Sequence, residues 1–255
     1  MNGRARGGAL GGAMLRATVE IAPDKALSSL REVGCALLDP TALCALAGVD
    51  RGTLEPLRSS WNALPPDEHL LDAGGYRFRR HACFTLGEHL DRVPHRAHYQ
   101  PLDYNALHGG LERWFAPIED EVALSSQLTT LLTTLGRELF ALKQTSRWFI
   151  EAHQFRIDAT RGMGRPTPEG AHRDGVEFVA VVLIDRVGIK GGETRVFEAE
   201  GPHGIRFTMR EPWTTLLLDD ARVIHETSPV QSITAGPAYR DTLVLTFRAD
   251  GFQSR

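Results

Sequence analysis

His172, Asp174 and His225 are the residues of this chain whose types and spacing could most clearly carry out chemistry. Two histidines and one carboxylate can bind one face of an octahedral Fe(II) ion and leave the other positions open. In a strand, alternate side chains share a face, so His172 and Asp174 would point the same way. The third ligand must come from a strand that is distant in sequence and adjacent in space. His225, which follows the apolar run 214–218, meets that need.

An arginine and a threonine beyond the distal histidine could bind an anionic co-substrate. Arg240 and Thr242 share one face of a strand-like run over 240–247, and a guanidinium beside a hydroxyl can bind a carboxylate through charge-assisted hydrogen bonds. The His-x-Asp pattern alone often arises by chance, whereas its combination with a distal histidine and Arg-x-Thr is more specific. Two alternatives stay open. The histidines could be ordinary turn residues beside a surface arginine, or the same ligands could bind zinc, which gives Arg240 no role.

Length, charge and hydropathy patterning exclude several classes of function. The chain has 255 residues and a formal net charge of -3, which suits one domain, expected over 21–255, and gives no electrostatic footprint for nucleic acid. No apolar stretch is long enough to span a membrane. Residues 1–20 are rich in Gly, Ala and Arg and lack the apolar core of a signal peptide. We therefore expect a flexible tail on a cytoplasmic protein, with reduced cysteines.

The elements that must position these residues fall into two parts. Residues 21–147 are expected to be rich in helix, and the longest amphipathic pattern covers 117–143. Residues 148–248 contain several short strands separated by turns. This order predicts a mainly β domain with helical support, an α+β chain whose core is a jelly-roll barrel. The mouth of such a barrel can hold a metal and a small ligand.

The expected strand over 149–157 carries polar side chains on both faces. Gln154 and Arg156 share one face and could contact the co-substrate or a substrate carboxylate. A polar pair that faces the surface is an equal alternative. His153 lies on the opposite face and is expected to be packed in the core, and the remaining histidines show no ligand spacing.

Three further residues could contact a substrate. Arg79 could bind an anionic group, although a solvated strand face explains it equally well. Asn105 could belong to a substrate loop with the glycines that follow it, or to a plain turn. Thr194 could line the pocket, but threonine is common in strands without any such role.

The segment 166–175, Pro-Thr-Pro-Glu-Gly-Ala-His-Arg-Asp-Gly, resembles a known family. It is similar to bacterial 2-oxoglutarate/Fe(II) dioxygenases that hydroxylate amino acids, among them isoleucine 4-hydroxylase and the N-succinyl amino-acid hydroxylases. Residues 105–115 and 153–156 fit the same family, as does the glycine pair at 191–192. The resemblance covers roughly residues 25–248. Many oxygenases share the metal motif, whereas the longer Pro-Thr-Pro-Glu-Gly-x-His-Arg-Asp-Gly pattern is specific to this group.

The resemblance implies a double-stranded β-helix of cupin-like form, with Fe(II) bound by His172, Asp174 and His225. It implies 2-oxoglutarate as co-substrate, its C5 carboxylate held by Arg240 and Thr242. O2 would be consumed and succinate and CO2 released, while an aliphatic C–H bond of a free or N-acylated L-amino acid, such as an N-succinyl derivative, is hydroxylated. Ascorbate would support turnover, and the resemblance also favours a homodimer.

Other functions stay open at this point. The same chemistry could act on a peptide or on a biosynthetic intermediate. A cupin-like barrel could instead bind a metal or small ligand without catalysis, and a zinc hydrolase would work without 2-oxoglutarate or O2.

Overall fold

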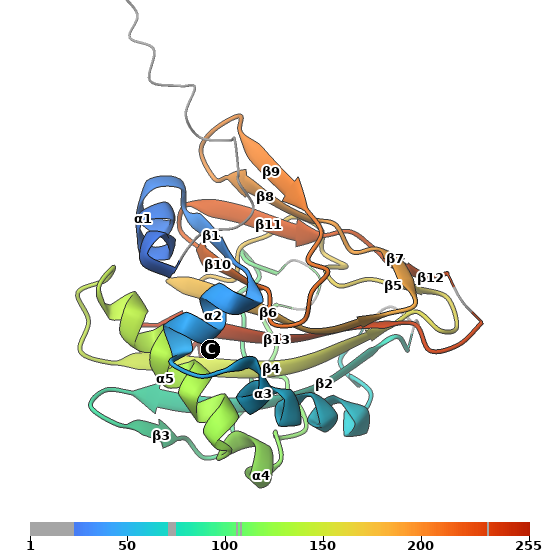
Figure 1. Cartoon of the computed structure of the whole chain (residues 1–255), viewed down its shortest axis with the longest axis horizontal. Helices are drawn as coiled ribbons and strands as arrows, with labels where there is room; N and C mark the ends of the chain where they lie inside the picture. The colour runs from blue at the N-terminus through green and yellow to red at the C-terminus, as the bar shows by residue number, and fades with distance from the viewer. Residues whose placement is uncertain (1–22, 71–74, 106, 108, 234) are drawn as a thin grey trace, which may run out of the picture.

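The computed structural model describes the chain except for residues 1–22, 71–74, 106, 108 and 234 (Figure 1). The flexible tail expected over 1–20 lies outside the described residues. The first part of the chain forms α1 (Pro23–Val33), β1 (Cys35–Leu38), α2 (Pro40–Ala47), α3 (Arg51–Leu54), the 3-10 helix η1 (Glu55–Ala63), β2 (Arg77–Leu86), β3 (Leu90–Arg92), α4 (Asp120–Ala123) and α5 (Ser126–Phe140).

The second part of the chain is built from strands. These are β4 (Trp148–Asp158), β5 (Met163–Gly164), β6 (Phe178–Val187), β7 (Ile189–Gly191), β8 (Thr194–Glu198), β9 (Gly204–Phe207), β10 (Thr215–Asp219), β11 (Val223–Thr227), β12 (Val230–Ser232) and β13 (Tyr239–Arg248). They form a large sheet in the order β1-β10-β6-β13-β4-β2-β3 and two smaller sheets, β11-β8-β9 and β5-β12-β7. This arrangement confirms the predicted mainly β domain with helical support, a double-stranded β-helix.

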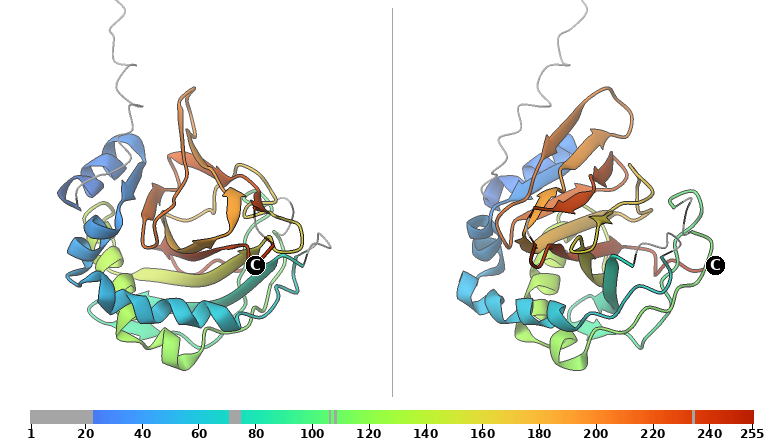
Figure 2. Two further views of the ribbon diagram at one scale, coloured as in Figure 1. Left: turned by 45° about the vertical axis from the view of Figure 1, so that its right-hand side comes forward. Right: turned by 90° about the vertical axis from the view of Figure 1, so that its right-hand side faces the viewer.

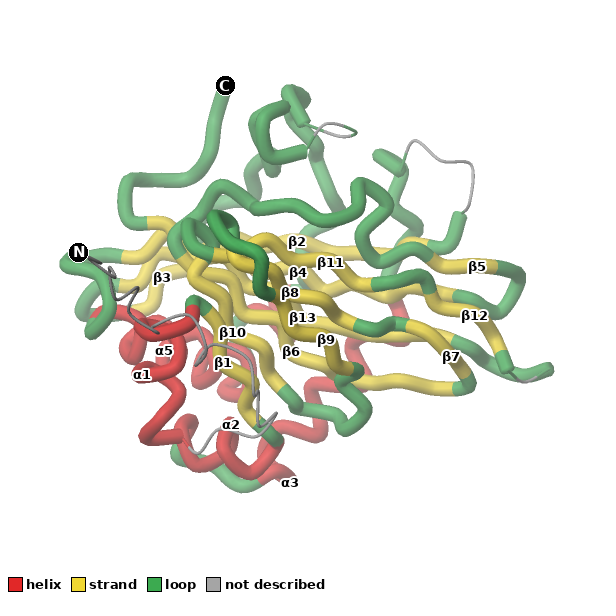
Figure 3. Tube along the Cα trace, turned by 90° about the horizontal axis from the view of Figure 1, so that it is seen from above, coloured by secondary structure: helices red, strands yellow, loops and turns green. Residues whose placement is uncertain are grey.

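The helices pack together against one face of the large sheet (Figures 1 and 3), and the smaller sheets lie on its other side (Figure 2). Alternation along each central strand separates the two faces. On β4, Ile150 and Ala152 are fully buried in the core between sheet and helices, while Glu151, His153 and Phe155 line a pocket on the other face. The pocket therefore lies inside the barrel, and the helices support its floor from outside.

The helix predicted over 117–143 is two helices in the structure. The side chain of Ser125 accepts a hydrogen bond from the backbone N–H of Leu128 and caps α5, so the chain turns between α4 and α5. Gly136 lets α5 approach the sheet, because a Cβ there would lie 2.4 Å from Cδ2 of the buried Leu86. The indole N–H of Trp148 donates to the carbonyl of Gly136 over 2.8 Å.

All three cysteines are free and buried. Within the described ranges, no helix is long and apolar enough to cross a membrane.

Candidate active site

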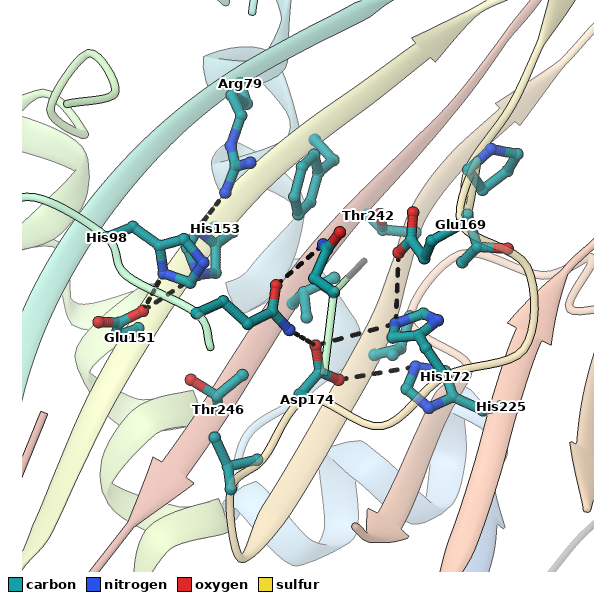
Figure 4. A pocket seen from close by; sticks show the side chains of 18 of the residues that line it. Arg79, His98, Glu151, His153, Glu169, His172, Asp174, His225, Thr242 and Thr246 are labelled. Carbon is teal, nitrogen blue, oxygen red and sulfur yellow. Dashed lines mark hydrogen bonds and ion pairs between the residues drawn. The ribbon is translucent and has the colours of Figure 1, made fainter. Parts of the chain in front are cut away.

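His172, Asp174 and His225 meet at the pocket, and their ligand atoms all lie within 4.8 Å of one another (Figure 4). Nε2 of His172 is 3.9 Å from Oδ1 of Asp174, and Nε2 of His225 is 3.8 Å from Oδ2 of the same carboxylate. Nδ1 of His172 lies 2.9 Å from the carbonyl oxygen of Gly170. That contact places the ring proton on Nδ1 and leaves the lone pair of Nε2 free for a metal. The donor set and its orientation fit Fe(II).

Backbone pairing holds the two histidines side by side. The N–H of each donates to the carbonyl of the other over 3.0 Å, which makes an isolated antiparallel bridge rather than the expected strand over 172–174. A turn follows, and Asp220 fixes it: its carboxylate accepts hydrogen bonds from the backbone N–H groups of Asp174, Gly175 and Val176 at 2.9, 2.8 and 3.2 Å. Asp220 therefore holds the backbone segment that carries Asp174, the carboxylate that faces the metal site.

The charges around the histidines differ. Burial, and after it the charge of His172, lower the pKa of His225 to about 4, so the His225 ring is neutral at pH 7. Burial also disfavours a charged His172, but the negative charges of Asp174 and Glu169 outweigh it and raise the pKa of that ring. A bound cation would take the place of the proton on His172, because a ligating histidine must be neutral.

Arg240 and Thr242 line the same pocket on β13. The side chain of Arg240 is buried and forms no ion pair with any described carboxylate, and its Nε has no hydrogen-bond partner among those residues. Burial and the neighbouring Arg186 lower its pKa to about 10, which still leaves it charged at pH 7. A buried guanidinium without an acceptor is costly, so the site requires an anion at this position.

A chain of polar contacts joins the loop before α4 to the metal-facing carboxylate. Nδ2 of Asn105 donates to Oε1 of Gln100 over 3.0 Å, and Nε2 of Gln100 lies 3.4 Å from Oδ1 of Asp174. Asn105 is buried and lines the pocket, and its contact with a substrate stays a prediction. This loop needs a glycine at position 109, because a Cβ there would lie 2.4 Å from the carbonyl oxygen of Asn105. Gln100 had no recognisable signal in the sequence.

Gln154 and Arg156 lie on the face of β4 that points away from the pocket, so the prediction that they contact co-substrate or substrate is wrong. The amide of Gln154 donates to the hydroxyl of Ser60 over 2.7 Å, on the helix side of the sheet. Arg156 makes two hydrogen bonds to Asp241, at 2.8 and 2.7 Å. The alternation was read correctly, but the pocket lies on the other face because the helices cover this one.

Thr194 is also outside the pocket lining. Its hydroxyl pairs with that of Thr227 over 3.3 Å, and Thr227 is the partner that faces the cavity. Arg79 lines the pocket and is buried, which contradicts the alternative of a solvated strand face, and its contact with an anionic substrate stays a prediction.

His98 and His153 lie beside the carboxylate of Glu151 at one end of the pocket (Figure 4), and His81 belongs to the same group of side chains. Oε2 of Glu151 lies 2.5 Å from Nδ1 of His98 and 3.6 and 3.7 Å from Nε2 of His153 and His81. His153 was expected to be a core residue, and the other two were treated as ordinary. Cross-strand pairing of His81 with His153 brings these rings together, and sequence spacing cannot show that.

This group contains enough donors for a second metal, but its hydrogen bonds oppose that use. Nη2 of Arg79 lies 2.7 Å from Nδ1 of His153. Because a guanidinium can only donate, Nδ1 must accept and the ring proton sits on Nε2, where it faces Glu151. In this arrangement the Nε2–H of His153 faces the carboxylate at 3.6 Å, and the ring offers no lone pair to a cation.

Comparisons with known proteins agree with this geometry. The family model described as 2OG-Fe dioxygenase matches residues 58–246. The chain is similar to the crystal structure of a bsmA homolog from Methylobium petroleophilum PM1, with 51% identity over 93% of this chain and 97% of that one, and a TM-score of 0.88. Among curated proteins, none matches the chain.

Two more distant structures share the fold. IDO from Bacillus thuringiensis is 16% identical over 90% of this chain and all (100%) of that chain, with a TM-score of 0.74. The Fe(II)/α-ketoglutarate-dependent dioxygenase TqaL is 19% identical over 91% of this chain and 92% of that chain, with a TM-score of 0.69. The family uses Fe(II), 2-oxoglutarate and O2. The chain therefore belongs to the 2OG-Fe dioxygenase family and is a 2-oxoglutarate-dependent non-haem iron dioxygenase.

Proposed function

We propose that His172, Asp174 and His225 bind Fe(II), and that Arg240 with Thr242 binds the C5 carboxylate of 2-oxoglutarate. We further propose that the enzyme hydroxylates an aliphatic C–H bond of a free or N-acylated L-amino acid. One observation carries the assignment of the site. A two-histidine, one-carboxylate group shares its pocket with a buried arginine that has no anionic partner among the described residues.

Fe(II) with 2-oxoglutarate supplies the oxidising chemistry when both are bound, and it uses O2 and releases succinate and CO2. The residues of the chain position the reactants. His172 and His225 are fixed by their paired backbones, and Asp174 by the turn that Asp220 anchors. Arg240 orients the co-substrate through a charge-assisted hydrogen bond. Arg240 is only 4% exposed, so water screens its contact with the co-substrate weakly.

The lining of the pocket supports a small charged substrate. The cavity has a volume of about 150 Å³, and its wall includes the guanidinium groups of Arg77, Arg79 and Arg113 as well as the carboxylates of Glu151 and Glu169. Such a wall suits a molecule with ionised groups at close spacing. The motif over 166–175 resembles that of amino-acid hydroxylases. A peptide or a biosynthetic intermediate remains the alternative substrate class.

The test is turnover with a defined substrate panel. The protein is loaded with Fe(II) under anaerobic conditions and then given air, 2-oxoglutarate and ascorbate. The panel contains free aliphatic L-amino acids, their N-acetyl and N-succinyl derivatives, and short peptides. Succinate and a product heavier by one oxygen atom are measured by mass spectrometry, and we expect both with an amino acid or its derivative. A product formed only from peptides would contradict the amino-acid assignment.

Variants separate the metal site from the fold. Asp174→Ala should abolish succinate formation, because the metal loses its only carboxylate ligand. Asp91→Ala removes an exposed carboxylate from the edge strand β3 and should leave turnover unchanged. If Asp174→Ala kept the activity, the assignment of the metal site would be wrong.

A further inference from the structure

Arg113 is a buried cation whose guanidinium has no acceptor in the described part of the chain. Its side chain lines the pocket and the residue is 5% exposed. Two backbone hydrogen bonds to His98, both 2.9 Å, fix its position, while Nε is buried without a partner. A buried charge that lacks hydrogen-bond partners is strongly unfavourable. The position is therefore built for an anionic group that the chain itself does not supply.

The neighbouring arginines have an ion-pair partner, whereas Arg113 has none among the described residues. Arg77 and Arg79 both face Asp67, at 2.6 and 3.7 Å. Arg79 also donates toward His153, and its guanidinium lies 3.5 Å over the ring of Phe115. The carboxylate of Asp67 is thus shared by two arginines and is not available to a third. Although burial lowers the pKa of Arg113 to about 10, the residue stays charged at pH 7.

This cationic end of the pocket is distinct from the co-substrate position. Ile157 on β4 is paired with Arg77 on one side and with Arg240 on the other. Two strand spacings separate those arginines, which is about 10 Å. Arg113 lies at the Arg77 end, because its guanidinium is 5.5 Å from the ring of Phe115, which Arg79, the neighbour of Arg77 at Asp67, covers at 3.5 Å. A second anionic group can therefore bind while 2-oxoglutarate occupies Arg240.

Glu169 is the complementary anion. It stands three residues before His172 in the Pro-Thr-Pro-Glu-Gly motif, lines the pocket and points toward the metal site (Figure 4). Its side chain is 13% exposed, and Oε1 lies 3.5 Å from Nε2 of His172. That contact is the only ion pair of Glu169 among the described residues. It engages Nε2 of His172, the nitrogen that would bind a metal. Once a metal is bound, the carboxylate of Glu169 is left to another cation.

Glu169 and Arg113 line one pocket with opposite charges and do not form an ion pair across it. We propose that these two residues bind the charged ends of a free α-amino acid, with the ammonium group at Glu169 and the carboxylate at Arg113. This inference rests on the proposed function and selects the unacylated zwitterion as its substrate. Acylation removes the positive charge of the amine, so an N-acyl derivative would leave Glu169 without a partner in a buried site.

Matched substrates test the inference. The probes are L-leucine, L-isoleucine and L-valine, each as the free amino acid, the N-acetyl and N-succinyl derivatives, and the carboxamide. We expect kcat/KM for the best free amino acid to exceed that of its N-acyl derivative and of its carboxamide by about 100-fold, since each loses one charged hydrogen bond. Turnover of N-succinyl derivatives in preference to free amino acids would overturn the inference and leave the proposed function standing. If no probe is turned over, the proposed function itself fails.

Two variants assign the contacts. Arg113→Met should raise KM for the free amino acid by about 100-fold, with the KM for 2-oxoglutarate unchanged. Glu169→Gln should raise KM for the free amino acid and leave KM for the N-acetyl derivative unchanged. The preference for the free amino acid over the N-acetyl derivative should therefore become smaller. The exposed residues Arg206 and Glu200 provide charge-matched controls, as Arg206→Met and Glu200→Gln.

Iron content distinguishes the role of Glu169 from metal binding. Metal analysis of the anaerobically loaded protein should give the same iron stoichiometry for Glu169→Gln and the wild type. Loss of iron in this variant would show that Glu169 belongs to the metal site and would overturn its assignment to the ammonium group. Unchanged KM values in both variants would overturn the inference as a whole.

Discussion

Arg240 should act on co-substrate binding above all, because its buried guanidinium faces the pocket with no acidic partner among the described residues. Arg240→Met should raise KM for 2-oxoglutarate by about 100-fold, since a hydrogen bond to a charged group contributes about 1.5–3 kcal/mol. The value of kcat at saturating 2-oxoglutarate should change far less. Initial rates of succinate release over a range of 2-oxoglutarate concentrations give both parameters.

The exposed Arg206→Met variant is the control for the loss of a positive charge, and it should match the wild type. If Arg240→Met raised KM for the amino acid and left KM for 2-oxoglutarate unchanged, the two anion positions would have been assigned the wrong way round.

Single residues could be predicted where residue type and alternation were sufficient. His172, Asp174 and His225 could be predicted from residue type, because two histidines and one carboxylate form a common metal-binding set. The structure brings their ligand atoms together. The alternation between Gln154 and His153 is correct, but the face that borders the pocket is the one that carries His153, which is buried there, and not the one that carries Gln154. Which face of β4 borders the pocket depends on which face the helices cover, and that is a property of the packed domain.

At the scale of elements, the turn after His172 depends on one carboxylate. Asp220 accepts three backbone hydrogen bonds, from residues 174–176, and an asparagine would present an N–H₂ group to some of those donors. Asp220→Asn should therefore lower the affinity for Fe(II) by about 10- to 100-fold, the range found when partners of metal ligands are removed. Anaerobic Fe(II) titration of the metal-free protein measures this.

Asp219→Asn alters the adjacent carboxylate, which among the described residues accepts only a local hydrogen bond from the N–H of Ala221, and should leave the iron affinity unchanged. Equal iron affinity in Asp220→Asn and wild type would show that the turn is held by other contacts.

The elements themselves were predicted most accurately where periodicity was long. The series of strands from β4 to β13 follows the alternating and apolar runs of the sequence. The prediction of one helix over 117–143 is wrong at Ser125. The side chain of Ser125 caps the start of α5 there, although the apolar pattern of the sequence continues across this position. The strand expected at His172 is a single bridge, since its pairing ends where Asp220 binds the backbone.

At the scale of the whole molecule, the buried histidines should make stability depend on pH. Burial lowers the pKa of His81, His98 and His153 below their usual 6.5, and that of His98 to about 4. An unfolded histidine binds a proton as the pH falls below about 6.5, whereas the folded ring of His98 stays neutral until the pH approaches about 4. The contribution of His98 to the free energy of unfolding should therefore decrease as the pH falls through this window, by up to about 1.4 kcal/mol per pH unit, and His81 and His153 contribute in the same direction.

Denaturant unfolding of the metal-free protein between pH 6.5 and 4.5 measures this slope. His98→Gln should reduce it by about one proton, or about 1.4 kcal/mol per pH unit, whereas the exposed His89→Gln should keep the wild-type slope. An unchanged slope in His98→Gln would mean that this ring is already protonated in the folded protein.

The proposed active site binds Fe(II) through His172, Asp174 and His225 and 2-oxoglutarate through Arg240. Its most direct test is an anaerobic titration of the Fe(II)-loaded protein with 2-oxoglutarate, followed by the visible charge-transfer band of the chelated co-substrate. The wild type and Asp91→Ala should develop the band at the same concentrations, Arg240→Met should need about 100-fold more co-substrate, and Asp174→Ala should show none. A band of wild-type strength and affinity in Asp174→Ala would contradict the account.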